Sequence, residues 1–496
     1  MLLYKYMTLN QIFGRYKENL PQIEVKGLSQ NSKEIQKDWV FFAVKGHTVD
    51  GHEYIPSALL KGACAVVTQE ELEEVYPVPV IKVPNIDEAM ADAACAFYGN
   101  PSNSLNMIGI TGTKGKTSIS YLTESILFEA KRKPGVMGTI NYRVNGKMIS
   151  KAPNTTPAPL LLQNIIYQAK EAGCEDVVME VSSHALEYQR VRGIDFNIAV
   201  FTNLQRDHLD FHSTFDNYFA AKKKLFENLI SPDNAKQKKS AIINIDDPYG
   251  EKLAEMLKNK VKLITYSLNK PADFTATDIK TSLEGVTFKV NGESAKLNLL
   301  GAHNVYNALA AIAVASRLGI HIKTAIKGLA ALKGVPGRME RVDEGQGFYL
   351  FVDFAYTNEA LLKAYDAVAP FKRGRIITVF GCGGQRDTTK RPLMGASAAK
   401  NSDLVLITKD NPRKEDPNKI FADILNGMPF ADNFNIIPDR RQAIFEAVRA
   451  ARKDDIVIIA GKGHEDYQIL PGGVIHFSDR EEAEKALREY VFTKKI

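Results

Sequence analysis

The amino-acid sequence predicts an α/β protein of three domains, with a central P-loop domain built on a parallel sheet and a C-terminal doubly wound, Rossmann-like domain. The chain has 496 residues, which suggests about three domains of roughly 150 residues each. Short apolar runs alternate with helical stretches along most of the chain, as in parallel sheets covered by helices. A glycine-rich turn at residues 109–117 connects an apolar strand to a helix, as phosphate-binding loops do.

The composition is that of a globular protein, and it gives little support to a nucleic-acid partner. Hydrophobic residues make up 45% of the chain and charged residues 25%, which is ordinary for folded domains. The net charge is +6, but 64 basic residues face 58 acidic ones. Such a mild excess suits a polyanionic small molecule, such as a nucleotide, equally well. We therefore expect no nucleic-acid partner.

The cysteines and the apolar runs bear on the compartment. Cys64, Cys95, Cys174 and Cys382 have neither CxxC nor metal-type spacing, so a reducing compartment is the simpler interpretation. No stretch approaches the roughly 18 apolar residues of a membrane span, and the first residues lack the features of a secretory signal. We expect a cytoplasmic monomer that does not insert into membranes.

The first segment, residues 1–103, has the pattern of a small α/β domain. Its apolar runs and helical stretches alternate and lie at 39–44, 54–61, 65–67 and 86–97. The polar turn 28–33 could hydrogen-bond a sugar or a base, although a turn without a ligand explains it equally well.

The other two segments, residues 104–333 and 334–496, each alternate strands with helices. Strand candidates lie at 176–181 and 199–203 in the second segment and at 348–352, 375–380, 404–407 and 456–459 in the third. Ligands of such sheets bind at the carboxyl ends of the strands. Polar residues that directly follow these strands are therefore the first candidates for a site.

The turn at 109–117 contains what a phosphate-binding loop needs. Gly112 and Gly115 let backbone amides approach an anion, Lys116 supplies positive charge near the β- and γ-phosphates, and Thr117 offers a hydroxyl to Mg²⁺. Ile110 stands where the strict pattern has another glycine, so the loop is a variant. A turn kept only for packing is the alternative, but the lysine and the threonine favour triphosphate binding.

Glu180 lies at the end of a predicted strand, and His208 lies at another strand-to-helix junction of the same segment, so both could converge on this loop. A carboxylate and a neutral imidazole can ligate Mg²⁺ or order its water shell, and the ion would neutralise charge on a transferring phosphoryl group. His208 alone is more often a structural residue. Together with Glu180 and the loop it favours a metal site.

Two polar clusters each allow two interpretations. Residues 154–157 place Thr155 and Thr156 before a helix. Their hydroxyls either cap this helix or bind a ligand. Residues 301–307 place Asn304 and Asn307 on one helix face, where they either hold a nucleotide or satisfy the start of the helix.

Polar loops follow three predicted strands of the third segment, at 383–387, 410–413 and 461–465. Arg386, Arg413 and Glu465 could gather around a zwitterionic ligand, because arginine pairs with carboxylates in bidentate fashion and glutamate accepts from an ammonium group. Taken singly, each loop is more often a turn with surface ion pairs.

Together these motifs resemble the Mur ligase family, and within it the UDP-N-acetylmuramoyl-tripeptide synthetases of the meso-diaminopimelate-adding type. The resemblance covers nearly the whole chain and rests on several motifs in family order, which is far more specific than any one of them. The motifs are residues 111–117, 154–157, 179–184, 201–210, 337–340, 410–413 and 461–465.

The resemblance implies domains for a UDP-linked substrate (1–103), for ATP (104–333) and for an amino acid (334–496). It implies ATP-dependent amide ligation in peptidoglycan synthesis, and so a part in cell-wall growth, cell shape and division. ATP would phosphorylate the D-glutamate carboxylate of UDP-N-acetylmuramoyl-L-Ala-D-Glu, and the amine of a diamino acid would attack the acyl phosphate. ATP and Mg²⁺ are the implied cofactors, since a polyphosphate and a carboxylate otherwise repel each other.

The resemblance also implies a role for each motif residue. The implied catalytic residues are Lys116, Glu180, His208 and Lys222. The implied metal ligands are Thr117, Glu180, His208 and Lys222. The resemblance implies that Lys222 is carbamylated, whereas the sequence around it, taken alone, indicates a solvated lysine on a helix. The implied ATP site comprises Thr111, Gly112, Thr113, Lys114, Gly115, Lys116, Thr117, Asn304, Arg338 and Asp353. The implied UDP-substrate site comprises Ser32, Asn154, Thr155, Thr156, Ser182 and Arg190. The implied amino-acid site comprises Arg386, Asp410, Asn411, Pro412, Arg413, Gly461 and Glu465.

Some positions depart from the family pattern. Tyr356 and Asn358 stand where the family has histidine and proline, residues 31–33 replace Asp-Ser-Arg, and Tyr188 replaces a smaller or amide residue. The alternatives are addition of L-lysine or another diamino acid, a folylpolyglutamate synthetase-like ligase, and a non-catalytic paralogue. Arg413 favours meso-diaminopimelate, because its charge attracts a distal carboxylate and repels the side-chain ammonium of lysine.

Overall fold

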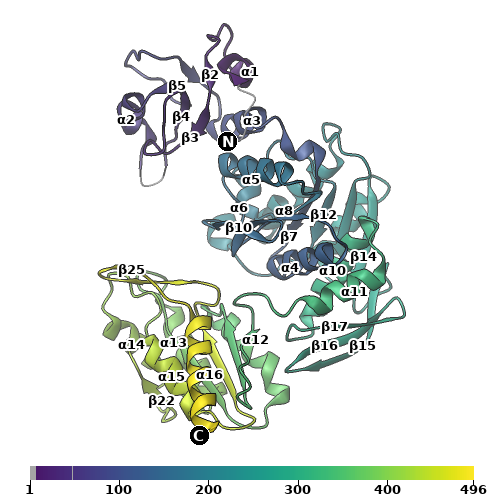
Figure 1. Cartoon of the computed structure of the whole chain (residues 1–496), viewed down its shortest axis with the longest axis vertical. Helices are drawn as coiled ribbons and strands as arrows, with labels where there is room; N and C mark the ends of the chain where they lie inside the picture. Colours follow the sequence, from purple (N-terminus) through teal and green to yellow (C-terminus); the bar gives the residue numbers. More distant parts are fainter. Residues whose placement is uncertain (1–6, 47–48, 496) are drawn as a thin grey trace. The chain divides into compact units, whose positions relative to one another are not determined.

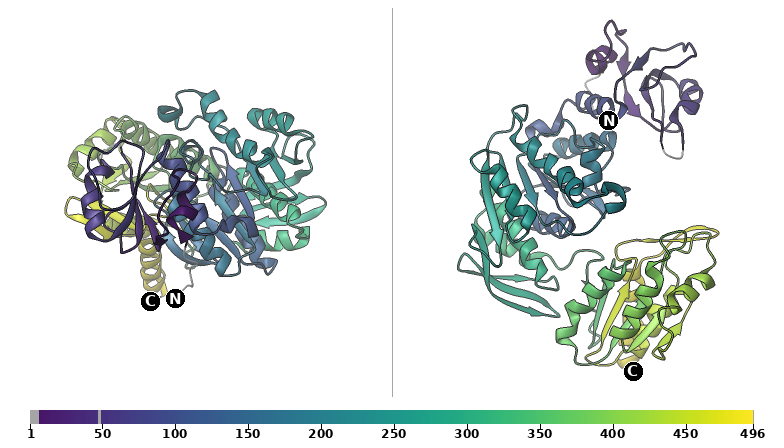
Figure 2. Two further views of the ribbon diagram at one scale, coloured as in Figure 1. Left: turned by 90° about the horizontal axis from the view of Figure 1, so that it is seen from above. Right: turned by 180° about the vertical axis from the view of Figure 1, so that it is seen from behind.

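The computed structural model describes residues 7–46 and 49–495. The chain divides into two compact units. The first comprises the described residues up to Ala276 together with Tyr306–Gly328, and the second comprises Thr277–Val305 and everything described from Leu329 on. Figures 1 and 2 show the helices and strands of both units.

A four-stranded parallel sheet forms the N-terminal part of the first unit. Its strands, in spatial order, are β3 (Gly27–Ser29), β4 (Trp39–Ala43), β5 (Ala63–Thr68) and β6 (Val80–Lys82). Alternate residues of β4 face opposite cores, because side chains on a strand have a period of two: Val40 and Phe42 pack in one core, and Phe41 and Ala43 in the other. The remaining elements are β1 (Met7–Thr8), α1 (Leu9–Phe13), β2 (Glu24–Val25), η1 (Gly51–Tyr54), α2 (Ile55–Leu60) and α3 (Ile86–Phe97).

The larger sheet has eleven strands, in the order β10-β9-β8-β11-β7-β12-β13-β14-β15-β16-β17. Seven neighbouring strands of this sheet pair in parallel, each with the next, in the order β8, β11, β7, β12, β13, β14 and β15. The strands are β7 (Asn106–Thr111), β8 (Pro134–Met137), β9 (Asn141–Val144), β10 (Lys147–Lys151), β11 (Asp176–Glu180), β12 (Ile198–Phe201), β13 (Ser240–Asn244), β14 (Lys262–Ser267), β15 (Phe274–Ser282), β16 (Gly285–Val290) and β17 (Glu293–Leu297).

The strand β7 lies between β11 and β12, and the chain order reverses at this strand. The crevice at the carboxyl end of such a strand is where ligands of open α/β sheets bind. The position of β7 therefore brings the 109–117 turn, the end of β11 and the end of β12 to one edge of the sheet.

Helices pack on this sheet through apolar faces. Helices α5, α8 and α9 share one core with Met107, Met179 and Phe201 of the sheet, whereas α4 contacts β7, β8 and β11. The helices are α4 (Lys116–Glu129), α5 (Pro159–Glu171), α6 (Ser183–Glu187), α7 (Leu209–His212), α8 (Phe215–Ile230), α9 (Pro248–Leu257), α10 (His303–Arg317) and α11 (Ile322–Ala331), and the short turn η2 (Pro101–Ser104) precedes β7.

The C-terminal part of the second unit is doubly wound. Its sheet has the order β18-β19-β23-β20-β21-β22. Ile456 and Ile458 of β23 face one core, and Val457 and Ile459 face the other, so helices cover both faces. The elements are β18 (Glu340–Arg341), β19 (Tyr349–Asp353), α12 (Asn358–Val368), η3 (Ala369–Phe371), β20 (Ile376–Phe380), α13 (Lys390–Asn401), β21 (Leu404–Ile407), α14 (Pro417–Leu425), β22 (Phe434–Ile436), α15 (Arg440–Ala450), β23 (Ile456–Ala460), the hairpin β24 (Tyr467–Leu470) and β25 (Gly473–His476), and α16 (Asp479–Lys495).

The predicted α/β class and the predicted strands of the site are confirmed. The candidates at 176–181, 375–380, 404–407 and 456–459 correspond to β11, β20, β21 and β23 within one or two residues. The alternation of strands and helices does not predict the hairpin of β9 and β10 or that of β16 and β17. The outer strand β10 is mostly exposed, so its sequence lacks the apolar run that marks a buried strand.

No described helix is both long and apolar enough to cross a membrane. All four cysteines are free thiols and all are buried. Burial raises the pKa of Cys64 to about 11 and those of Cys95 and Cys382 to about 12.

Candidate functional site

The phosphate-loop candidate lies where β7 ends and α4 begins. Gly112 (φ +138°) and Gly115 (φ +94°) have left-handed backbone conformations, which favour glycine. A Cβ atom on Gly112 would lie 1.9 Å from Thr202 Oγ1, and one on Gly115 would lie 2.5 Å from Asn307 Oδ1. Both glycines are therefore required by packing as well as by backbone conformation.

Residues at the end of β12 hold this loop. The Thr113 amide donates to Asn203 O (2.8 Å), and the Lys114 amide donates to Asn203 Oδ1 (3.0 Å). Thr202 Oγ1 donates to Lys114 O (2.7 Å). The loop is thereby fixed at the N-terminus of α4, where backbone amides and the helix dipole favour an anion.

Glu180 ends β11 beside the loop and is 1% exposed. Its Oε2 accepts from Thr117 Oγ1 (3.0 Å) and from Thr139 Oγ1 (2.9 Å), and its Oε1 accepts from the Thr139 amide (3.0 Å). A Cβ atom on Gly138 would lie 2.2 Å from Oε1. Gly138 and Thr139 thus form a cradle for the carboxylate, and two predicted metal ligands, Thr117 and Glu180, are in contact.

Lys222 lies in α8 and is 1% exposed, so it is not a solvated helix lysine. Its Nζ donates to Gly112 O (3.0 Å), the carbonyl that also accepts from Lys116 Nζ (2.8 Å). Burial, reinforced by the charge of Lys116, lowers the pKa of Lys222 well below its usual value. A neutral lysine amine has a lone pair that can attack CO₂, and this is the chemistry that carbamylation requires.

His208 directly precedes α7 and has a left-handed backbone (φ +52°). Its ring centroid lies 4.9 Å from that of His184 and 6.2 Å from that of Tyr218. Burial, together with the charge of Lys116, lowers the pKa of His208. The neutral imidazole, which is the form that ligates metals, is therefore favoured near pH 7.

The oxygen atoms around Glu180 fit a magnesium ion. Within the described ranges, no group of three or more His, Cys, Asp or Glu side chains is arranged to hold a metal. Mg²⁺ prefers oxygen ligands, usually keeps several waters, and needs one or two carboxylates plus substrate phosphates. The Thr117 hydroxyl and the buried Glu180 carboxylate, next to a phosphate loop, are such a donor set.

The threonines of the 154–157 turn do not cap the following helix. Helix α5 has Ala158 at its N-cap, with no side-chain cap bond. Thr156 is fully buried, and its Oγ1 donates to Glu180 O (2.8 Å) and accepts from the Ser182 amide (3.1 Å). Thr155 Oγ1 lies 3.2 Å from Thr139 Oγ1. The turn is therefore tied to the Glu180 cradle, whereas the Asn154 side chain is exposed.

The other predicted UDP-substrate residues lie in two places. Ser182 caps α6 by accepting from the Ala185 amide (3.2 Å). Arg190 Nη1 donates to Thr156 O (3.1 Å), and its guanidinium lies 5.8 Å from the centroid of the Tyr188 ring. Ser32 lies apart from these residues in sequence, buried in the turn that follows β3.

Three predicted nucleotide residues belong to the second unit. Asn304 Nδ2 donates to Leu300 O (2.8 Å), a carbonyl that precedes α10. Arg338 lies 5.6 Å from the centroid of the Phe354 ring. Asp353, at the end of β19, accepts from the Met339 amide (2.6 Å), and burial raises its pKa to about 6.

The departures at Tyr356 and Asn358 do not disturb the backbone. The Tyr356 ring is exposed, and Lys390 Nζ lies 5.0 Å from its centroid. Asn358 starts α12 with Thr357 as its N-cap, and it accepts from Ser397 Oγ (2.6 Å). The helix thus begins at Asn358 without the proline that is common at a first helical position.

The 410–413 and 461–465 loops share a buried polar cluster. Asn411 Nδ2 and Lys462 Nζ both donate to Glu465 Oε2, at 3.0 and 2.9 Å. Burial raises the pKa of Asp410, while Lys462 opposes this rise. A Cβ atom on Gly461 would lie 2.8 Å from Asp410 Oδ2. Fully buried Lys462 was not among the predicted residues, although its place in Gly-Lys-Gly-His after a strand was a usable signal.

The 383–387 loop is joined to the 410–413 loop. Arg413 Nη1 donates to Gly384 O (2.9 Å) and to Asn411 O (3.3 Å), and the Gly384 amide donates to Asn411 O (2.9 Å). A Cβ atom on Gly384 would lie 2.0 Å from Pro412 O. Arg386 is exposed on the same loop. The structure therefore brings the predicted amino-acid loops together.

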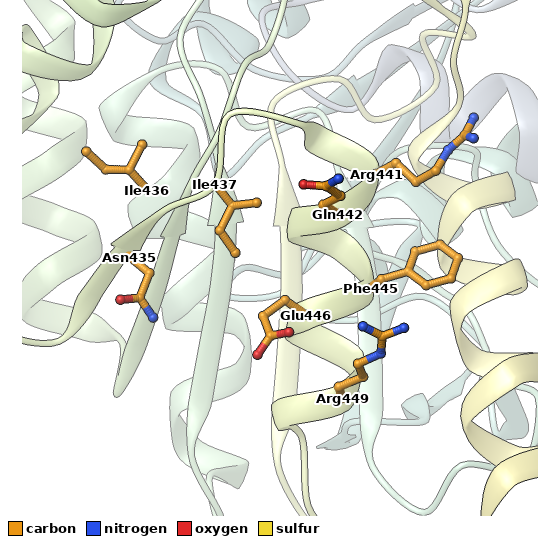
Figure 3. Close-up of a pocket in the computed structure, with 8 residues that line it drawn as sticks. All are labelled: Asn435, Ile436, Ile437, Arg441, Gln442, Phe445, Glu446 and Arg449. Carbon is orange, nitrogen blue, oxygen red and sulfur yellow. The ribbon is translucent and has the colours of Figure 1, made fainter.

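A hollow of about 690 Å³ lies elsewhere in the second unit, between β22 and α15. Figure 3 shows the residues that line it, among them Arg441, Phe445 and Arg449. Arg441 and Arg449 form ion pairs with Glu482 and Glu489 of α16. None of the predicted site residues lines this hollow, and its arginines already have carboxylate partners.

Family comparisons cover most of the chain. The description "Mur ligase family, catalytic domain" matches residues 24–98, "Mur ligase middle domain" matches 110–315, and "Mur ligase, glutamate ligase domain" matches 337–463. Two relatives are named UDP-N-acetylmuramoyl-L-alanyl-D-glutamate–2,6-diaminopimelate ligase. The one from Clostridium tetani is 41% identical over 97% of this chain and 100% of its own. The one from Geobacter metallireducens is 42% identical over 94% and 95%.

Solved structures share the architecture. One titled as a UDP-N-acetylmuramoyl-L-alanyl-D-glutamate–2,6-diaminopimelate ligase is 31% identical, with a TM-score of 0.69 over 98% of this chain and 99% of its own. A MurF ligase from Thermotoga maritima in complex with ADP is similar in fold, at 19% identity and a TM-score of 0.63 over 95% and 99%. The chain has the loops that surround Lys116, Glu180 and Arg413, and relatives over 40% identical match it along nearly its full length. The chain therefore belongs to the Mur ligase family.

Proposed function

We propose that this protein is an ATP-dependent ligase that joins meso-diaminopimelate to the D-glutamyl residue of UDP-N-acetylmuramoyl-L-alanyl-D-glutamate. One observation carries the proposal: four relatives that are 41–43% identical over at least 94% of this chain are all named for that reaction. The domains are assigned as residues 1–103 for the UDP-substrate, 104–333 for ATP and 334–496 for the amino acid. The protein would act in the cytoplasm as a monomer.

The first step would form an acyl phosphate. The D-glutamate carboxylate attacks the γ-phosphorus of ATP, the bond to the β,γ-bridging oxygen breaks, and ADP leaves. Amides of residues 111–117 and the Lys116 ammonium would bind the phosphates, with Asn304, Arg338 and Asp353 at the rest of the nucleotide. Lys116 would exchange its bonds with loop carbonyls for bonds with phosphate oxygens, which carry full charge and form stronger hydrogen bonds.

The second step would form the amide. The free amine attacks the acyl carbon, the tetrahedral intermediate expels phosphate, and the nitrogen loses a proton. Thr117, Glu180, His208 and carbamylated Lys222 would hold Mg²⁺, which when bound offsets negative charge on the phosphates. Thr139 would keep Glu180 oriented through its two hydrogen bonds.

The substrate contacts follow the predicted assignments. Ser32 would lie at the uridine nucleotide, and Asn154, Thr155, Thr156, Ser182 and Arg190 would bind the muramoyl dipeptide. Thr156 is fully buried with its hydroxyl engaged, so its part would be to shape the turn. Arg190 and the Asn154 side chain are more accessible and are better placed to contact the ligand.

The amino-acid site would bind the charged groups at both ends of meso-diaminopimelate. Arg413, supported by Arg386, Gly461 and Glu465, would pair with the distal carboxylate, and Glu465 would accept from an ammonium group. Asp410, Asn411 and Pro412 would complete the site. L-Lysine carries an ammonium group where meso-diaminopimelate has this second zwitterionic end, so an arginine there disfavours it.

The proposal is tested by phosphate release from ATP with purified protein, Mg²⁺ and UDP-N-acetylmuramoyl-L-Ala-D-Glu. meso-Diaminopimelate, L-lysine and L-ornithine are compared as amines. Release with meso-diaminopimelate at least about tenfold faster than with the others is expected. Preference for L-lysine would correct the amine alone. No release with any amine, together with glutamate addition to a folate, would replace the proposal with a folylpolyglutamate synthetase-like activity.

A further inference from the structure

A buried arginine outside the predicted site connects its loops. Arg391 in α13 is fully buried, although a guanidinium stays charged in proteins. Its Nη1 donates to Glu415 Oε1 and to Asp423 Oδ2, both at 2.7 Å. Its Nη2 donates to Glu415 Oε2 (2.9 Å) and to Gly383 O (3.1 Å). One side chain thus holds the 383–387 loop, the segment after Arg413, and α14.

Glu415 holds the 383–387 loop a second time. Its Oε2 also accepts from the Gln385 amide (2.7 Å), and Gln385 has a left-handed backbone (φ +53°) that non-glycine residues rarely adopt. The hydrogen bonds from Arg391 and from this amide lower the pKa of Glu415 to about 2, so it is an anion at every pH at which a ligase is assayed. The charged carboxylate therefore stabilises an otherwise unfavourable turn.

Gly384, which lies between Gly383 and Gln385, accepts a hydrogen bond from Arg413. Gly384 has Gly383, held by Arg391, on one side and Gln385, held by Glu415, on the other. Its carbonyl accepts from Arg413 Nη1 (2.9 Å), and its backbone lies against Pro412, where a Cβ atom would approach the Pro412 carbonyl to 2.0 Å. The position of the Arg413 guanidinium thus depends on a loop that Glu415 and Arg391 fix.

We propose that Glu415 and Arg391 are positioning residues of the amino-acid site: they hold the 383–387 loop so that Arg413 faces the distal carboxylate of the amine substrate. The assignment rests on the proposed function of Arg413. When a charged residue orients a ligand-binding residue without touching the ligand, its substitution changes the affinity for that ligand and leaves the affinities for other substrates unchanged.

The test compares substitutions of the two carboxylates that bind the buried Arg391. Glu415→Gln removes the charge that holds the 383–387 loop, whereas Asp423→Asn removes the other carboxylate of Arg391, which belongs to α14. Glu415→Gln is expected to raise the KM for meso-diaminopimelate about tenfold, with kcat and the KM values for ATP and the UDP-substrate within about twofold of wild type. Asp423→Asn is expected to leave all of them within about twofold. Arg413→Ala gives the reference for direct loss of the contact.

Hydrogen exchange of the 383–387 amides provides a readout that does not need turnover. Exchange is expected to be about tenfold faster in Glu415→Gln and unchanged in Asp423→Asn. An unchanged amine KM in folded Glu415→Gln, an equal rise in Asp423→Asn, or unchanged loop exchange would overturn the proposal. If Glu415→Gln does not fold, Glu415→Asp, which keeps the charge but shortens the reach, carries the same expectations. A wild type that ligates no amine would refute the proposed function, while loop exchange still decides the positioning role.

Discussion

At the scale of single residues, Lys116 and Lys222 share one acceptor. The Nζ atoms of both side chains donate to Gly112 O, so the charge of Lys116 favours the neutral form of Lys222. The sequence marks Lys116 through the loop pattern, but it gives no sign of the burial of Lys222. Only the fold shows that Lys222, the first lysine of the run 222–224, points toward the loop, because adjacent helix positions face in different directions.

Lys116→Ala is expected to abolish ligation while binding of the UDP-substrate stays within about twofold of wild type. The substitution removes the charge that offsets the phosphates, worth at least about a hundredfold in rate, and leaves the 154–157 turn intact. Phosphate release and equilibrium binding of the UDP-substrate are the two measurements. Full turnover in the variant would remove the loop from the reaction.

Asp353→Asn is expected to change how stability depends on pH. The folded pKa of about 6 lies above the ordinary 3.8, so the folded state binds more protons and the contribution of Asp353 falls as pH rises from about 4 to 6. The variant has no such loss, and above pH 6 it should be more stable than wild type by about 3 kcal/mol.

Denaturant unfolding at pH 4, 5, 6 and 7 measures this difference. Asn retains an acceptor for the Met339 amide, so the hydrogen bond to Asp353 Oδ2 has a replacement. Stability curves that run parallel from pH 4 to pH 7 would show that Asp353 does not titrate in this window.

At the scale of elements, α8 combines packing with function. Tyr218, Leu225 and Phe226 of this helix lie in the core beneath the sheet, and Lys222 occupies a core position among them. The apolar pattern of the helix predicts its buried face, but a lysine on that face contradicts the pattern. Such local contradictions are expected at functional sites.

Lys222→Met is expected to stabilise the protein by about 1–2 kcal/mol and to abolish ligation. Methionine fills a similar volume without the cost of burying an amine. Thermal unfolding in bicarbonate-depleted buffer measures the gain. Lys223→Met, at the partly exposed neighbour that pairs with Glu227, is the matched control and should change stability by less than about 0.5 kcal/mol. Equal effects of the two substitutions would contradict the argument from burial.

At the scale of the whole molecule, each unit has its own apolar cores. Alternation of strands and helices predicts the α/β class and the strands that end at the site. It does not predict that residues 277–305 group with the C-terminal unit. Such grouping depends on contacts between residues far apart in sequence, such as Leu283 and Leu300 with Phe351, which local pattern does not contain.

Two units with separate cores are expected to unfold in at least two calorimetric transitions. Ile458→Ala in β23 and Met179→Ala in β11 each remove a fully buried side chain, which costs about 2–5 kcal/mol. Each variant should lower a different transition. A single transition lowered equally by both variants would show that the units unfold as one.

The buried cysteines limit how this enzyme can be inhibited. Electrophilic inhibitors react with thiolates, and the thiols of Cys64, Cys95 and Cys382 have pKa values of about 11 to 12 beneath packed side chains. A covalent warhead directed at cysteine would find little thiolate at neutral pH.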